Sequence, residues 1–199
     1  MAGRLSEMTL EQLWQLFPII LTPYNPDWKN WYREQQDILS DALPAEQVIR
    51  ISYVGSTAIG TIWAKPTVDI LVEVRKESNL TDLAKLLDGC GYTLMSRQDN
   101  RMSFNLGYTE NGFAEKVFHL HLRLEGDHDE LYFRDFLIEY PQVAKEYEQL
   151  KLSLWKQFEH DRDGYTEAKT AFVRSVTEKA RKLYNGRYET DLEKGLEES

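Results

Sequence analysis

The chain has 199 residues, of which 42% are hydrophobic, and a formal net charge of −9 at pH 7. This length fits one domain, or one domain with a helical appendage, and it is sufficient to bury a core without disulfides. The acidic balance argues against general nucleic-acid binding, although it leaves room for a local basic pocket.

Neither a membrane span nor a secretion signal is visible in the sequence. No apolar run reaches the roughly 18 residues that a transmembrane helix needs. The first residues lack the continuous apolar segment and small-residue cleavage site of a signal peptide. Cys90 is the single cysteine and cannot form an internal disulfide. We therefore expect a cytoplasmic protein in a reducing compartment, with no membrane partner.

Helical and strand periodicities alternate through the first half of the chain. The predicted elements are a helix over 9–17 stopped by Pro18, a helix over 27–43 ended by Pro44, a strand over 48–54, a GSTAIG loop that opens a short helix, a strand over 67–74, and a helix over 80–87. In the 67–74 strand, alternation places Asp69, Leu71 and Glu73 together on one face.

The second half begins with strands and ends with helices. The predicted elements are strands over 92–97, 101–108 and 116–124 with a turn at 111–112, a helix within LYFRDFLIEY, a helix beginning at Pro141, a turn at DRDG (161–164), and a last helix over 166–184. The charged segment 186–199 is predicted to be a frayed or disordered tail. This order predicts a mixed α/β or α+β sheet followed by a helical segment.

The Gly55-Ser56 pair and Asp69 form a first candidate site. A Gly-Ser pair between a strand and a helix frees backbone N–H groups that, with the serine hydroxyl, can hold a phosphate. A carboxylate on the next strand can bind a divalent cation beside it. The alternative is a tight turn with an exposed strand aspartate, but a carboxylate in an apolar strand needs a compensating partner.

His119 and His121 form a second candidate group. On a strand they share one face, with Cα atoms roughly 6.6 Å apart at a rise of about 3.3 Å per residue. Such a pair can hold a metal or serve as metal ligand and acid/base, or it can simply pack on a half-exposed sheet. A two-histidine phosphoesterase would need a second motif, which His128 and His160 do not form.

The polar and aromatic residues of the helical segment are weaker candidates. They include the pair Arg134-Asp135, together with Lys151, Tyr165 and Lys169. Composition alone favours a helix-surface pair and solvated lysines here.

Several of these stretches resemble the GrpB family, which belongs by fold to the nucleotidyltransferase superfamily. The resemblance runs from about Leu21 to Tyr184 and rests on PYNPDW, YVGSTAIGTIWAKPTVDILVEV, FHLHL, YFRDFLIEYPQVAKEYEQLK and YTEAKTAFV. It implies a single nucleotidyltransferase-like domain over 1–185, with a mixed β-sheet, flanking helices, a C-terminal helical segment, and an N-terminal helical extension over 1–20.

This sequence departs from the superfamily pattern at one position that affects metal binding. The pattern has a Gly-Ser loop, two carboxylates one residue apart on a strand, and a third carboxylate on a later strand. Gly55, Ser56 and Asp69 match, but Leu71 stands at the second carboxylate position. Glu73 would lie roughly 13 Å from Asp69 along the strand. Imidazoles at the third position would favour Zn²⁺ or Mn²⁺ over Mg²⁺.

The resemblance implies metal-dependent nucleotidyl transfer to an unidentified acceptor as the first hypothesis. Asp69, His119 and His121 would then hold the metal or act as acid/base, and Tyr165 would stack on a base. Phosphate would be held by the predicted binding group of Gly55, Ser56, Thr57, Lys65, Arg101, Arg123 and Lys169. Leu71 supports a second hypothesis, a catalytically inactive module that binds a nucleotide or a phosphorylated small molecule. A pure interaction scaffold is the third.

Overall fold

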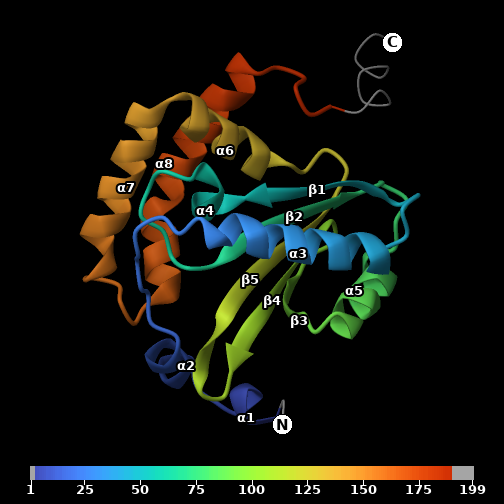
Figure 1. The fold of residues 1–199 in the computed structure, drawn as a ribbon, viewed down its shortest axis with the longest axis horizontal. Helices are drawn as coiled ribbons and strands as arrows, with labels where there is room; N and C mark the ends of the chain where they lie inside the picture. Colours follow the sequence, from blue (N-terminus) through green and yellow to red (C-terminus); the bar gives the residue numbers. More distant parts are fainter. Residues whose placement is uncertain (1–2, 190–199) are drawn as a thin grey trace.

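The computed structural model describes residues 3–189, which form one five-stranded mixed sheet and surrounding helices (Figure 1). The strand order is β1-β2-β5-β4-β3. The strands are β1 (Val48–Val54), β2 (Val68–Val74), β3 (Thr93–Arg97), β4 (Arg101–Thr109) and β5 (Gly112–Leu124). β2 and β5 are parallel, and the other neighbouring pairs are antiparallel. The predicted mixed α/β sheet is confirmed.

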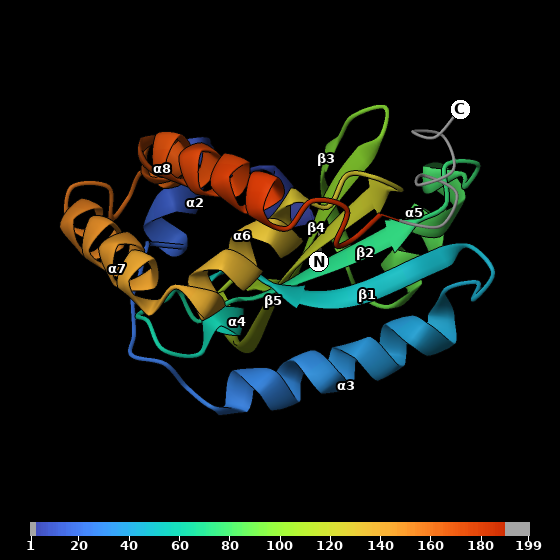
Figure 2. The same ribbon diagram turned by 90° about the horizontal axis from the view of Figure 1, so that it is seen from above.

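The helices lie on both sides of this sheet. They are α1 (Gly3–Ser6), α2 (Leu10–Leu16), α3 (Asp27–Ala42), α4 (Gly55–Ile59), α5 (Leu80–Gly89), α6 (Asp129–Glu139), α7 (Pro141–Trp155) and α8 (Arg162–Leu183). Figure 2 shows α3 along one side of the sheet, with α6, α7 and α8 grouped on the other. None of the helices within residues 3–189 is long and apolar enough to cross a membrane.

The two sheet faces have different chemistry because the strands alternate. Val68, Ile70 and Val72 on β2 face the main core, which also contains buried side chains of α3 and α5. The opposite β2 face carries Asp69 and Glu73. The helices α3 and α5 therefore cover the apolar face of the sheet, and its polar face is directed toward the helices α6, α7 and α8.

Most predicted boundaries lie close to the observed ones, and two of them change. Thr9 caps α2 and forms a capping box with Gln12, as the 9–17 prediction requires. The DRDG segment was predicted wrongly as a turn outside the last helix. Asp161 is instead the N-cap of α8 and accepts a hydrogen bond from Gly164 N at 2.8 Å. β5 also begins earlier than predicted, at Gly112.

The chain packs against the domain beyond the end of α8. The side chain of Tyr188 donates to Asp135, and its backbone carbonyl accepts a hydrogen bond from Arg50 at 2.7 Å. The predicted tail over 186–199 is therefore packed in its first residues, 186–189. The remainder of that prediction lies outside the described residues.

Candidate functional site

Asp69, His119 and His121 converge through the parallel pairing of β2 with β5. The register places Asp69 opposite His119. His119 Nδ1 lies 3.3 Å from Asp69 Oδ1, and His121 Nε2 lies 3.7 Å from the same oxygen. Two histidines of one strand face thus converge on a carboxylate of the neighbouring strand.

Gly55 brings the β1–α4 junction against Asp69. Its φ of 73° lies in the left-handed region, which glycine adopts without steric penalty. A Cβ at this position would lie 2.2 Å from Asp69 Oδ2. The predicted convergence of Asp69 and the two histidines beside Gly55-Ser56 is therefore observed.

A hydrogen-bonded chain orients His119 toward Asp69. Arg162 Nη2 donates to Tyr108 Oη at 2.7 Å, and Tyr108 Oη lies 2.8 Å from His119 Nε2. Burial raises the pKa of Tyr108 and lowers the pKa of His119, so the hydroxyl stays protonated and the imidazole stays neutral. Tyr108 then donates to Nε2, which leaves the His119 proton on Nδ1, facing Asp69.

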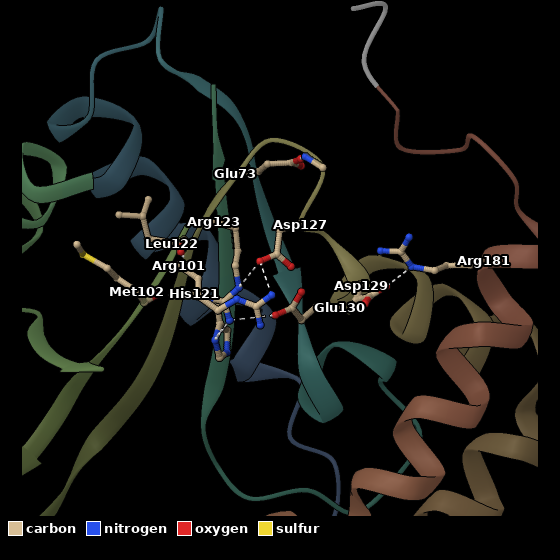
Figure 3. A network of polar contacts seen from close by, with 11 residues as sticks. Glu73, Arg101, Met102, His121, Leu122, Arg123, Asp127, Asp129, Glu130 and Arg181 are labelled. Atoms are coloured by element: carbon tan, nitrogen blue, oxygen red, sulfur yellow. Dashed lines mark hydrogen bonds and ion pairs between the residues drawn. The ribbon is translucent and has the colours of Figure 1, made fainter. Parts of the chain in front are cut away.

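A second chain orients His121. Arg123 Nη2 lies 3.2 Å from His121 Nδ1, and guanidinium groups only donate. Nδ1 must therefore accept, which places the proton of His121 on Nε2, facing Asp69. Figure 3 shows Arg123 between His121 and the carboxylates of Asp127 and Glu130.

The two imidazoles keep Asp69 ionised. Burial alone would raise the pKa of this carboxyl group, but the facing N–H groups of His119 and His121 outweigh burial and hold its pKa well below the usual range. Asp69 is thus a fixed negative charge at the edge of a buried region.

A metal ion would require both imidazoles to change tautomer. It needs the nitrogen lone pairs on the sides of His119 and His121 that face Asp69, and in the tautomers inferred above those nitrogens are donors. Leu71, at the second carboxylate position, is fully buried. Glu73 accepts from Gly126 N and pairs with Arg50 and His128. Within residues 3–189 no group of three or more His, Cys, Asp or Glu side chains is placed to hold a metal.

A small cavity of about 30 Å³ opens beside Asp69. Its wall comes from α4, the loop before β2, β2, α7 and α8, and the lining residues are Ser56, Lys65, Thr67, Asp69, Lys151, Tyr165 and Lys169. Four of the predicted site residues other than Asp69, namely Ser56, Lys65, Tyr165 and Lys169, are thus brought together here.

The three lysines make the cavity cationic. Burial, reinforced by neighbouring cations, lowers the pKa of both Lys65 and Lys151 to about 7. Burial also lowers the pKa of Lys169 to about 8, against the opposing effect of Asp69. Three lysines with lowered pKa values thus face one carboxylate, and an anionic ligand would favour their protonated forms.

Tyr165 contributes a hydroxyl rather than a stacking surface. Its side chain is 1% exposed, and Lys169 Nζ lies 4.2 Å from the centroid of its ring. The prediction that this ring stacks on a base is therefore wrong, because no open ring face remains. Its hydroxyl is buried without a hydrogen-bond partner among the described residues. Burial raises the pKa of Tyr165, so this hydroxyl is a donor to a ligand in the cavity.

Lys151 was a weaker candidate in the sequence and was not included in the predicted binding group. It is 2% exposed and donates to the backbone carbonyl of Trp63, while Glu148 Oε1 accepts from Trp63 N at 2.8 Å. One turn of α7 therefore holds the loop after α4 and places an ammonium group in the cavity wall. From the sequence alone, a lysine on a helix with polar and apolar residues is expected to face solvent. The only sequence feature that set Lys151 apart from other surface lysines was its place in the stretch that resembles GrpB.

Four predicted phosphate-binding residues do not line the cavity. Gly55 contacts Asp69 beside it, and the predictions for the other three need correction. Thr57 is buried and donates to Thr67 O at 3.1 Å. Arg101 pairs with Asp127 at 2.7 Å. Arg123 donates to Met102 O and pairs with Glu130, so its only link to the site is through His121.

Residues 18–179 match the GrpB protein family. The chain belongs to the GrpB family. The glutamate-rich protein GrpB of Alkalihalophilus pseudofirmus is 34% identical over 166 residues, covering 79% of this chain and 93% of that protein. The UPF0157 protein YqkA of Bacillus subtilis is 29% identical over 82% of this chain. The match covers 48% of YqkA, so the chain spans about half the length of that relative.

A solved structure supports the same assignment. GrpB from Enterococcus faecalis is similar with a TM-score of 0.72 and 27% identity, covering 83% of this chain and 99% of that chain. A Cid1 poly(U) polymerase structure is similar at a TM-score of 0.46 and 15% identity, over 65% of this chain and 42% of that chain. A similarity at that level carries no argument about chemistry.

Gly55→Ala tests the close approach to Asp69, with Gly60→Ala as the matched control. Both glycines have φ near +80°, so alanine at either position should lose about 1–2 kcal/mol of unfolding free energy. A Cβ at Gly60 meets only Tyr24 at 4.0 Å, whereas a Cβ at Gly55 overlaps the Asp69 carboxylate. Urea unfolding should therefore show the larger loss for Gly55→Ala. Equal losses would contradict the close approach.

Proposed function

We propose that this GrpB protein binds the phosphoryl group of a small phosphorylated ligand, such as a nucleotide, in the lysine-lined cavity. The observation that carries the proposal is the convergence of Lys65, Lys151 and Lys169 with the unpartnered hydroxyl of Tyr165 around one small cavity. This binding mode draws on the protein's own cations and needs no metal ion.

Charge and size both favour a phosphoryl group. The three lysines face the single carboxylate of Asp69, and their protonated forms leave an excess of positive charge that suits a dianion such as a phosphate monoester. The net charge of the chain is −9, so the attraction is confined to this cavity. A cavity of about 30 Å³ is far too small for a whole nucleotide, so only the terminal phosphoryl group of such a ligand would reach into it from the surface.

The polar groups of the cavity have separable roles. Lysine N–H groups and the Tyr165 hydroxyl donate to phosphate oxygens in charge-assisted or buried hydrogen bonds. Ser56 lines the same cavity and adds a further hydroxyl. Asp69 accepts only, so it repels phosphate oxygens and instead selects a hydroxyl or amine on the ligand next to the phosphoryl group.

Metal-dependent nucleotidyl transfer is the second candidate and stays a prediction. Its support is the position of Asp69 against Gly55-Ser56, as the resemblance implies. Leu71 and the protonated nitrogens of His119 and His121 weigh against it. Pyrophosphate release from labelled nucleoside triphosphates with Mg²⁺, Mn²⁺ or Zn²⁺ would establish transfer. Nucleotide binding without release under each metal would favour the binding module.

Lys169→Gln should weaken phosphate binding. It removes one charge-assisted donor, a group with a net contribution of about 1.5–3 kcal/mol, so phosphate should bind roughly 10- to 100-fold more weakly. Isothermal titration calorimetry with phenyl phosphate measures the change. Lys179→Gln is the matched control, because Lys179 is exposed on the same helix α8. If Lys169→Gln binds as tightly as the control variant, the lysine cavity is not the anion site.

Phosphate affinity should fall as the pH rises from about 7 to about 9. The lowered pKa values mean that Lys65 and Lys151 lose protons near pH 7 and Lys169 near pH 8, whereas a phosphate monoester, with a second pKa near 6, stays a dianion. Asp69 stays ionised throughout, and Tyr165 stays protonated because burial raises its pKa.

The bound dianion favours protonated lysines, so ligand binding is coupled to proton uptake. The affinity for the ligand therefore falls as the pH rises and fewer protons are available. Calorimetry in buffers of different ionisation enthalpy should register this uptake above pH 7. Constant affinity across the interval, or affinity that increases with pH, would rule out the lysines as the ligand-binding cations.

A further inference from the structure

A second cavity of about 60 Å³ adjoins the lysine-lined cavity. The two share Lys65 and Thr67, which come from the loop before β2. The second cavity also extends along β5, from Phe113 and Val117 toward His119, so the two cavities open side by side at the start of β2 and β5.

The walls of this second cavity are mainly apolar. Pro18, Ile20, Phe113 and Val117 line it, together with the cations Arg162 and Lys65 and the exposed acidic residue Glu115. Ile20 is 41% exposed, a large apolar side chain left open to solvent at the mouth of a cavity. Such a wall suits an apolar ligand group, since burying that group would remove Ile20 from water.

An aromatic cluster supports the cavity from below. The ring centroid of Phe17 lies 4.8 Å from that of Tyr108 and 5.1 Å from that of Phe113, and the latter two are 5.2 Å apart. The Arg162 guanidinium lies 5.8 Å from the Phe113 centroid and donates to Phe17 O. Of these groups, Phe113 and Arg162 line the cavity, so a planar ring can meet one aromatic side chain and a guanidinium group here.

The segment that carries Pro18 and Ile20 is held in place by hydrogen bonds on both sides. Ile19 N donates to Glu159 O at 2.7 Å, and Trp155 Nε1 donates to Ile19 O at 2.6 Å. Thr22 then pairs with Ala64, next to Lys65. The wall is thus preformed and connected directly to the loop that supplies the shared lysine.

We propose that the second cavity binds the apolar, planar body of the ligand whose phosphoryl group occupies the lysine-lined cavity. The ligand class is a phosphate monoester of an aryl or nucleoside-like group, with Lys65 at the junction of the two parts. This inference rests on the proposed phosphate site and adds selectivity for the ester group.

Three probes separate the two parts by calorimetry: inorganic phosphate, methyl phosphate and phenyl phosphate. All three should bind, and phenyl phosphate should bind about tenfold more tightly than methyl phosphate, because only its ring reaches the apolar cavity. Equal affinities for phenyl and methyl phosphate would overturn the second subsite while leaving the phosphate site intact. Failure of all three to bind would overturn the proposed function itself.

The variant Ile20→Ser tests whether this cavity is responsible for the preference for phenyl phosphate over methyl phosphate. The variant should lose most of the phenyl preference and keep the methyl phosphate affinity of the unaltered protein. Ile38→Ser is the matched control, because Ile38 is 45% exposed on α3, which packs on the opposite face of the sheet. A phenyl preference that survives Ile20→Ser, or falls equally in both variants, would refute the assignment.

Discussion

The candidate site depends on one buried charge, the carboxylate of Asp69. A carboxylate in a mainly apolar central strand is unfavourable unless its environment supplies hydrogen-bond donors. Here the parallel pairing of β2 with β5 supplies the imidazoles of His119 and His121 from a neighbouring strand. Arginines behind both imidazoles fix the protons on the side of Asp69. The sheet register therefore determines the ionisation state of the site.

The lysines depend on the same charge. Desolvation alone makes three buried ammonium groups unfavourable, and Lys169 further lowers the pKa of both Lys65 and Lys151. Asp69 opposes this effect for all three. The single negative charge of Asp69 thus stabilises the lysine cluster but does not neutralise all three lysines when they are protonated. A cationic cavity with residual repulsion is suited to an anion, whose arrival would stabilise both the lysines and the loop they hold.

The sequence determined which face each site residue occupies but not its distance from the site. Period-two alternation correctly placed His119, His121 and Arg123 on one face. It did not show that β4 pairs with β5 so that Arg101 lies opposite Arg123, which is four residues, or about 13 Å, beyond His119. Lys151 escaped for a related reason. Its burial comes from the contact of α7 with Trp63, a tertiary contact that helix periodicity does not encode.

Leu71 connects the fold to the choice of ligand. Two carboxylates at positions 69 and 71 would give a negative site that attracts divalent cations. Leu71 instead packs with Val54 and Leu131 in a small buried cluster, so that position adds apolar contact rather than charge. With one carboxylate removed and three lysines facing the other, the local charge has the opposite sign. A site of that sign would attract phosphate directly and repel the cations that would otherwise carry it, which is why we propose binding ahead of metal-dependent transfer.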